Sequence, residues 1–93
     1  MTTTTSKPPA IPESVILVVY GREHCHLCQD MIARLHELQA RLLFRLEVVD
    51  IDSNAELVAR YGERVPVLAA NGKEICHYHL DPIALDAYFS RIR

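Results

Sequence analysis

The stretch that decides the fold spans residues 15–28 and reads Val15-Ile16-Leu17-Val18-Val19-Tyr20-Gly21-Arg22-Glu23-His24-Cys25-His26-Leu27-Cys28. Its first six residues form a continuous apolar and β-branched run, which is typical of a strand covered on both faces. A short polar loop begins at Gly21, and apolar residues recur at helical spacing from Leu27 onward. The two cysteines therefore stand where a buried strand passes into an amphipathic helix.

This placement of the cysteines predicts a particular chemistry. A thiol at the N-terminus of a helix meets unpaired backbone N–H groups and the positive end of the helix dipole. Both favour the thiolate and lower the thiol pKa. Cys28 stands about one helical turn after Cys25, so the two thiols can close a disulfide. We therefore expect thiol–disulfide chemistry.

Size and charge narrow the class of protein. The chain has 93 residues, which is enough for one domain. Ten Lys and Arg face twelve Asp and Glu, a net charge of −2 with no long run of either sign. This is not the charge distribution of a nucleic-acid-binding protein. We therefore expect no nucleic-acid partner.

Cysteine usage and the N-terminus indicate the compartment. Three cysteines are too few, and odd in number, for the disulfide framework of a small secreted protein. The first residues lack the basic start and apolar stretch of a signal peptide, and the apolar run over 15–19 is too short to cross a membrane. We expect a cytoplasmic protein with no membrane partner, whose Cys-x-x-Cys is catalytic or metal-binding rather than structural.

Periodicity and turn signals outline the remaining elements. Residues 1–14, rich in threonine and proline, predict a flexible leader ahead of a domain at 15–93. Helical spacing predicts a helix over 27–43 whose stripe includes Leu43, and a strand is expected over 44–51. A capping box of Ser53 and Glu56 opens a short helix that ends at a left-handed Gly62.

The C-terminal half reads as a hairpin followed by a helix. A strand over 65–70 leads through Asn71-Gly72, which predicts a type I′ turn, into an edge strand over 74–79. Asp81-Pro82 supplies a cap and a first helical residue for the last helix, which has Ile83 among its apolar positions. The order is β-α-β-α-β-β-α. Two crossovers through helices predict parallel neighbours, and the hairpin adds an antiparallel edge to a four-stranded mixed sheet flanked by helices.

Three stretches in this order resemble the thioredoxin fold, and more narrowly the short glutaredoxin-like proteins of bacteria. They are Val19-Tyr20-Gly21-Arg22-Glu23-His24-Cys25-His26-Leu27-Cys28, Glu47-Val48-Val49-Asp50-Ile51-Asp52 and Tyr61-Gly62-Glu63-Arg64-Val65-Pro66-Val67-Leu68. The resemblance implies an α/β, thioredoxin-like fold of glutaredoxin type. It also implies a dithiol–disulfide oxidoreductase in which Cys25 is the nucleophile and Cys28 the resolving thiol.

The same resemblance implies how a substrate binds. Pro66 is expected to follow a cis peptide bond and to face the cysteine pair, which leaves the backbone of Val65 free to pair with an extended thiol substrate. Arg22 stands where glutaredoxins often carry a lysine, and is expected to favour the thiolate or a glutathione carboxylate. His26, between the cysteines, is expected to tune the redox poise. No bound cofactor is expected, and glutathione is the candidate co-substrate.

The chain departs from glutaredoxins at two places. The dipeptide between the cysteines is His26-Leu27 rather than Pro-Tyr. The Gly-Gly-x-x-Asp-like stretch that binds glutathione in glutaredoxins is replaced by a segment without those glycines, Cys76-His77-Tyr78-His79-Leu80-Asp81. Dependence on glutathione therefore stays open. The expected partner is a disulfide-containing or glutathionylated protein or a small-molecule thiol, and the expected state is a monomer.

Two alternatives to the oxidoreductase remain. Cys25, Cys28, Cys76 and one histidine are a suitable set of Zn²⁺ ligands by residue type, and an Fe–S cluster bridging two copies through Cys25 is a further variant. Residues 76–79 read as an edge strand in which Cys76 and Tyr78 point one way and the histidines the other, so a dedicated metal site is not our expectation. The other alternative is a non-catalytic protein-binding module that retains the fold as a scaffold.

Overall fold

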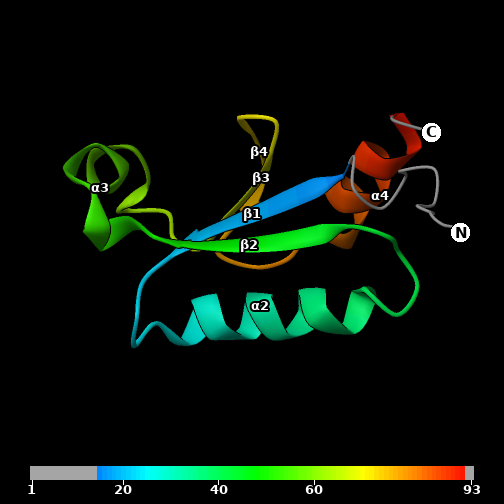
Figure 1. Cartoon of the computed structure of the whole chain (residues 1–93), viewed down its shortest axis with the longest axis horizontal. Helices are drawn as coiled ribbons and strands as arrows, with labels where there is room; N and C mark the ends of the chain where they lie inside the picture. Colours follow the sequence, from blue (N-terminus) through cyan, green and yellow to red (C-terminus); the bar gives the residue numbers. More distant parts are fainter. Residues whose placement is uncertain (1–14, 92–93) are drawn as a thin grey trace, which may run out of the picture.

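The computed structural model describes residues 15–91 (Figure 1). The leader expected over residues 1–14, and residues 92 and 93 of the last helix, lie outside the described residues. The elements in chain order are β1 (Ile16–Gly21), α2 (His26–Leu38), β2 (Arg45–Asp50), the 3₁₀ turn η2 (Ile51–Ser53), α3 (Ala55–Tyr61), β3 (Val67–Ala70), β4 (Lys73–His77) and α4 (Pro82–Arg91). Within 15–91 no helix is long and apolar enough to cross a lipid bilayer.

The four strands form one mixed sheet in the order β2-β1-β3-β4. β1 runs parallel to β2 and antiparallel to β3, and β4 runs antiparallel to β3. The predicted four-stranded mixed sheet is thus confirmed, but the second crossover does not return a parallel strand. The reason is length: the seven residues of α3 span about 10 Å, whereas a six-residue strand spans about 20 Å. Since α3 is too short to carry the chain back along the sheet, β3 starts at the same end and runs in the opposite direction.

The helices cover the sheet from both sides (Figure 1). Leu17 and Val19 of β1 share the larger apolar core with residues of α2 and α4. Tyr20, whose side chain alternates to the other face, joins the smaller core beneath α3, which is built around Ile51, Tyr61 and Val67. The continuous apolar run of β1 is explained by this double coverage.

α2 ends at Leu38, five positions before the predicted end at Leu43. The backbone N–H groups of Gln39 and Ala40 bond to carbonyls three residues earlier, which tightens the chain into a turn. The Gln39 amide then donates to the Phe44 carbonyl at 3.1 Å and closes that turn. Leu43 is consequently 58% exposed and lies outside the core, where Phe44 is buried instead.

The start and end of α3 also differ from the prediction. The N-cap is Asn54, whose side-chain oxygen accepts the Glu56 N–H at 2.8 Å, while the Ser53 hydroxyl donates to the Asp50 carbonyl within η2. The expected capping box is therefore not formed, because the 3₁₀ turn engages Ser53. Gly62 ends the helix in a right-handed conformation with φ −54°. Glycine is needed there because a Cβ would lie 2.6 Å from the Val58 carbonyl oxygen.

The hairpin between β3 and β4 is the predicted one. Asn71 and Gly72 both have positive φ, 53° and 79°, as a type I′ turn requires. β4 ends at His77, two residues before the predicted end, because Tyr78 has φ 68° and leaves the strand. The expected alternation therefore breaks: Cys76 is buried whereas Tyr78 is 43% exposed.

The last helix begins at the predicted place. The Asp81 carboxylate accepts the N–H groups of Ile83 and Ala84, and Pro82 is the first residue of α4. Leu85 is buried in the larger core. Ile83, one of the apolar positions noted for this helix, is 80% exposed on its first turn.

Candidate active site

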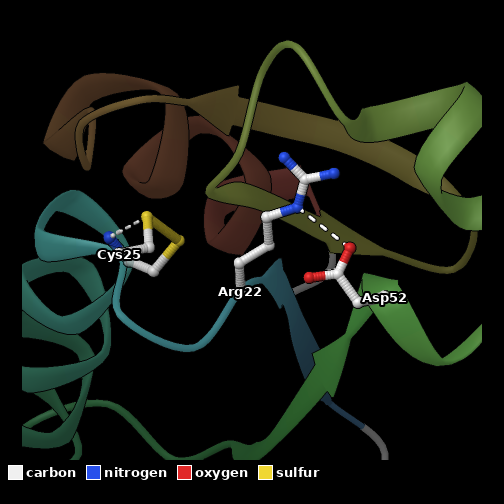
Figure 2. Close-up of a disulfide and its surroundings, with 4 residues drawn as sticks. Arg22, Cys25 and Asp52 are labelled. Atoms are coloured by element: carbon white, nitrogen blue, oxygen red, sulfur yellow. Dashed lines mark hydrogen bonds and ion pairs between the residues drawn. A yellow bond between two sulfur atoms is a disulfide. The ribbon is translucent and has the colours of Figure 1, made fainter.

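The cysteine pair lies at the start of α2, just beyond the end of β1 (Figure 2). Cys25 is the N-cap of α2, in an extended conformation, and Cys28 belongs to the first turn. The two residues form a disulfide, with their Cα atoms 5.2 Å apart, within the range that a disulfide requires. The structure therefore brings together the two thiols that the sequence singles out.

The two cysteines differ in exposure and in their polar contacts. Cys25 is partly exposed, whereas Cys28 is only 2% exposed. The Cys25 Sγ accepts the backbone N–H of Cys28 at 3.2 Å, so the sulfur occupies the place that a side-chain oxygen takes in an ordinary helix cap. The first turn of α2 carries no acidic residue that would oppose a negative charge. Both the N–H group and the helix dipole thus favour a thiolate on Cys25 once the disulfide is reduced.

The absence of a side chain at Gly21 leaves room for the buried Cys28. A Cβ built at this position would lie 3.0 Å from the Cys28 Sγ, closer than ordinary van der Waals contact. β1 therefore ends directly against Cys28. In the antiparallel pairing of β1 with β3, Tyr20 stands opposite Val67, so the next position places Pro66 opposite Gly21.

The segment that precedes β3 consequently lies on the same side of the fold as the dithiol. Pro66 is fully buried and Val65 is partly buried. The peptide bond between them is cis. The Pro66 carbonyl oxygen is engaged by the N–H of Tyr78 at 2.8 Å, which ties the segment to the end of β4.

Arg22 is directed toward Asp52 (Figure 2). Its Nε donates to the Asp52 carboxylate at 3.2 Å, and both side chains are substantially exposed, at 37% and 55%. The Asp52 N–H is in turn bonded to the Asp50 carboxylate, which caps η2. The sequence alone indicates only that Asp52 is a carboxylate after the second strand without a catalytic partner. The signal that could have found the pair is topological: Gly21 of β1 stands opposite Asp50 of the parallel β2, so the residues that follow them meet.

Arg22 also contributes to a surface hollow of about 500 Å³ formed with the end of α3 and the segment after it. Arg60 and Arg64 line the same hollow, as does Glu63. The guanidinium carbons of Arg60 and Arg64 each lie 5.8 Å from the centroid of the Tyr61 ring. Arg22 therefore stands in the loop before Cys25 and Arg64 directly precedes Val65, while Arg60, in the last turn of α3, adds a third positive charge to the same hollow.

The two histidines beside Cys25 are both exposed. His26 is the first residue of α2, and His24 has φ 59° in the preceding turn. Leu27, also between the cysteines, is 36% exposed. The dipeptide between the cysteines is thus presented at the surface next to the partly exposed Cys25.

Cys76 is not part of this site. It is a buried free cysteine in β4, and burial raises the pKa of its thiol. Among residues 15–91 no group of three or more His, Cys, Asp and Glu side chains is arranged to hold a metal ion. The Zn²⁺ ligand set of Cys25, Cys28, Cys76 and a histidine is thus not assembled here. His77, on the same strand, is bonded instead to the Glu74 carboxylate.

A mixed sheet of this order, with a Cys-x-x-Cys pair at the start of the first helix after β1, defines a glutaredoxin-like protein of thioredoxin fold. A sequence model of the Glutaredoxin-like domain family (DUF836) matches residues 16–90, and the chain belongs to this family.

Three proteins illustrate the similarity. The solution NMR structure of protein Ne2328 from Nitrosomonas europaea is 47% identical, covers 94% of this chain and 98% of its own, and has a TM-score of 0.75. An uncharacterized protein of Mycobacterium tuberculosis is 31% identical over 75 residues, which are 75% of this chain and 77% of that protein. A mutant thioredoxin from Halobacterium salinarum is 27% identical, with a TM-score of 0.55 over 83% of this chain and 73% of its own.

Proposed function

We propose that the protein is a dithiol–disulfide oxidoreductase with Cys25 as nucleophile and Cys28 as resolving thiol. The observation that carries the proposal is the position of the Cys25 Sγ, which caps α2 and accepts the Cys28 N–H at 3.2 Å. Cys25 is partly exposed and Cys28 is buried behind it, so an incoming disulfide meets Cys25 first. The family and the thioredoxin fold support the same chemistry.

The reaction in the reducing direction proceeds in two exchanges. The Cys25 thiolate attacks one sulfur of the substrate disulfide; a mixed disulfide forms, the substrate S–S bond breaks, and the other substrate sulfur leaves as a thiolate that takes a proton from water. Cys28 gives its proton to solvent and attacks the Cys25 sulfur, which releases the second substrate sulfur. Two electrons have then passed to the substrate, and the Cys25–Cys28 disulfide remains. The oxidising direction is the reverse.

The substrate in this proposal is a disulfide-containing or glutathionylated protein, or a small-molecule thiol, in the cytoplasm. In this proposal the backbone of Val65, which is partly buried, pairs with the substrate beside the dithiol, and the exposed His26 follows Cys25 directly in the chain. Arg22, together with the other arginines of its hollow, supplies positive charge for a carboxylate of the substrate. Glutathione as co-substrate, and a monomeric state, are part of the same proposal.

The experiment that tests this function compares three cysteine variants in disulfide exchange with a model disulfide. Cys25→Ser is expected to abolish exchange, because no other exposed thiol is present in residues 15–91. Cys28→Ser is expected to accumulate a mixed disulfide on Cys25, which mass spectrometry of the intact adduct detects. Cys76→Ser is the matched control, since this thiol is buried away from the site, and it should retain the parental rate.

Two outcomes would contradict the proposal. Equal residual turnover in Cys25→Ser and Cys28→Ser would overturn the assigned roles. Failure of the parent protein to form the Cys25–Cys28 disulfide reversibly in graded glutathione buffers would overturn the function itself and favour a protein-binding module.

A further inference from the structure

Tyr78 adopts a backbone conformation that is costly for an aromatic residue. Its φ is 68°, in the left-handed region that glycine enters readily and residues with a side chain seldom enter. Asn71, another residue with positive φ, is explained by the hairpin turn that it forms. Tyr78 follows the last residue of β4 and is the central residue of a γ-turn, closed by the His79 N–H bonded to the His77 carbonyl at 2.7 Å. A γ-turn with positive φ is rare and strained, so further contacts must help to maintain it.

Two hydrogen bonds join Tyr78 to the segment that precedes β3. The backbone N–H of Tyr78 donates to the Pro66 carbonyl at 2.8 Å. Its hydroxyl donates to the Glu63 carbonyl at 2.9 Å. Tyr78 is therefore bonded to both ends of segment 63–66: its backbone N–H to Pro66 and its hydroxyl to Glu63. The ring also meets the His77 ring edge-on, with centroids 4.6 Å apart, which limits its orientation.

The segment held in this way borders the dithiol. Pro66 directly precedes Val67, which pairs with Tyr20, and Tyr20 is followed by Gly21, the residue against which Cys28 packs. Arg64 of the same segment is tied to β4 as well, through a 2.6 Å ion pair with Glu74. Loss of the Tyr78 hydroxyl would therefore loosen the segment without releasing it.

Tyr78 also lines a groove beside the helix that carries the dithiol. With Leu27, the residue before Cys28, it lines a groove of about 330 Å³ along the first turns of α2. Both side chains are exposed apolar surface, at 43% and 36%. Asp30 and Arg34 of α2 supply the polar rim of the groove. Tyr78 thus contacts the 63–66 segment and lines a groove that includes Leu27, the residue before Cys28.

We propose that Tyr78 is a positioning residue of the dithiol site, selective for peptide substrates. Its hydroxyl and backbone hold residues 63–66 in the shape that receives the extended backbone beside a substrate's disulfide, and Tyr78 lines the adjoining groove. The proposal rests on the oxidoreductase function above. A substrate with peptide backbone depends on this segment, whereas a small disulfide that reaches only the Cys25 sulfur does not.

The test uses Tyr78→Phe, which removes the hydroxyl and keeps the ring and the backbone N–H. The pre-reduced protein is mixed with an excess of a peptide containing one intrachain disulfide, and separately with bis(2-hydroxyethyl) disulfide. For the peptide the half-saturating concentration should rise about threefold to tenfold, the range expected for one lost hydrogen bond, with the limiting rate unchanged. For the small disulfide, and for the reduction potential, no change is expected. Tyr88→Phe, in α4, is the matched control.

A second measurement is independent of activity. Amide hydrogen exchange at Glu63, Arg64 and Val65 should become faster in Tyr78→Phe and stay at the parental rate in Tyr88→Phe. Parental kinetics and parental exchange in Tyr78→Phe would overturn the proposal. So would an equal loss toward both disulfides or a shifted potential, because Tyr78 would then act on the dithiol itself. Absence of exchange in the parent protein, in contrast, would contradict the oxidoreductase function.

Discussion

At the scale of single residues, the site is set by backbone contacts around two sulfur atoms. Cys25 owes its reactivity in our proposal to its place at the cap of α2, since its Sγ takes the N–H that a helix start leaves unpaired. Cys28 owes its burial to Gly21, which leaves room for its side chain at the end of β1. Neither feature involves a charged side chain. The arginine nearest in sequence, Arg22, is directed toward Asp52 instead.

We predict that Gly21→Ala raises the reduction potential of the dithiol. The added Cβ would lie 3.0 Å from the Cys28 Sγ and 3.2 Å from the Cys28 Cβ. The Cβ contact is common to both redox forms, whereas the disulfide fixes the position of the Sγ and reduction frees it to change rotamer. The oxidised form is therefore destabilised more than the reduced form. A difference of about 1.4 kcal/mol between them corresponds to about 30 mV, which equilibration in glutathione buffers resolves.

Gly72→Ala provides the control for that substitution. Gly72 has φ 79° with nothing near its Cβ position, so an alanine there costs stability through the backbone alone, roughly 1 kcal/mol. Its reduction potential should match the parent's. A parental potential in Gly21→Ala would show that β1 accommodates the methyl group without crowding the sulfur.

At the scale of elements, the features that could be predicted from the sequence are those whose signal lies close to them along the chain. The hairpin at Asn71-Gly72 and the start of α4 at Asp81 were predictable, because each signal lies within three residues of the structure it specifies. The cysteine pair at the start of α2 belongs to the same group. The direction of β3 was not predictable by the crossover rule, because that rule ignores the length of α3, which is too short to return along the sheet.

The features that could not be predicted from the sequence depend on contacts between segments that are distant along the chain. The early end of α2 depends on the bond from Gln39 to Phe44, which forms only once the chain has turned. The pairing of Arg22 with Asp52 requires the parallel register of β1 and β2. Tyr78 gives no local signal at all, since tyrosine is a poor choice for a left-handed residue and its bonding partners lie 12 and 15 positions earlier.

The start of α3 allows an element-scale prediction. Asn54→Ala should destabilise the protein by about 1 kcal/mol, because its side chain accepts the Glu56 N–H at the cap. Ser53→Ala, the residue that the sequence pattern favours as the cap, should cost less, since its exposed hydroxyl donates only to the Asp50 carbonyl. Urea unfolding of the two variants ranks them. A larger loss of stability in Ser53→Ala than in Asn54→Ala would indicate that Ser53, as in the predicted capping box, is the residue that caps α3.

At the scale of the whole molecule, the layers place all of the proposed machinery at one end of the sheet. β1 and β2 are parallel and finish at the same end, where Cys25, Arg22 and Asp52 follow them. The antiparallel β3 begins at that end, which brings in Val65 and Pro66. The larger core, between the sheet and the helices α2 and α4, supports α2 from beneath. The orientation of the dithiol thus depends on how firmly α2 is packed.

That dependence gives the last prediction, which compares two leucines that the sequence pattern assigns to one helical stripe. Leu35 is fully buried in the larger core, so Leu35→Ala should cost about 2–5 kcal/mol through lost burial and a residual cavity. Leu43 is 58% exposed beyond the end of α2, so Leu43→Ala should change the free energy of unfolding by no more than about 0.5 kcal/mol. For a domain of this size each kcal/mol lowers Tm by roughly 4–8 °C, so thermal unfolding separates the two variants clearly. Equal losses would place Leu43 in the core and extend α2 to the end that helical spacing predicts.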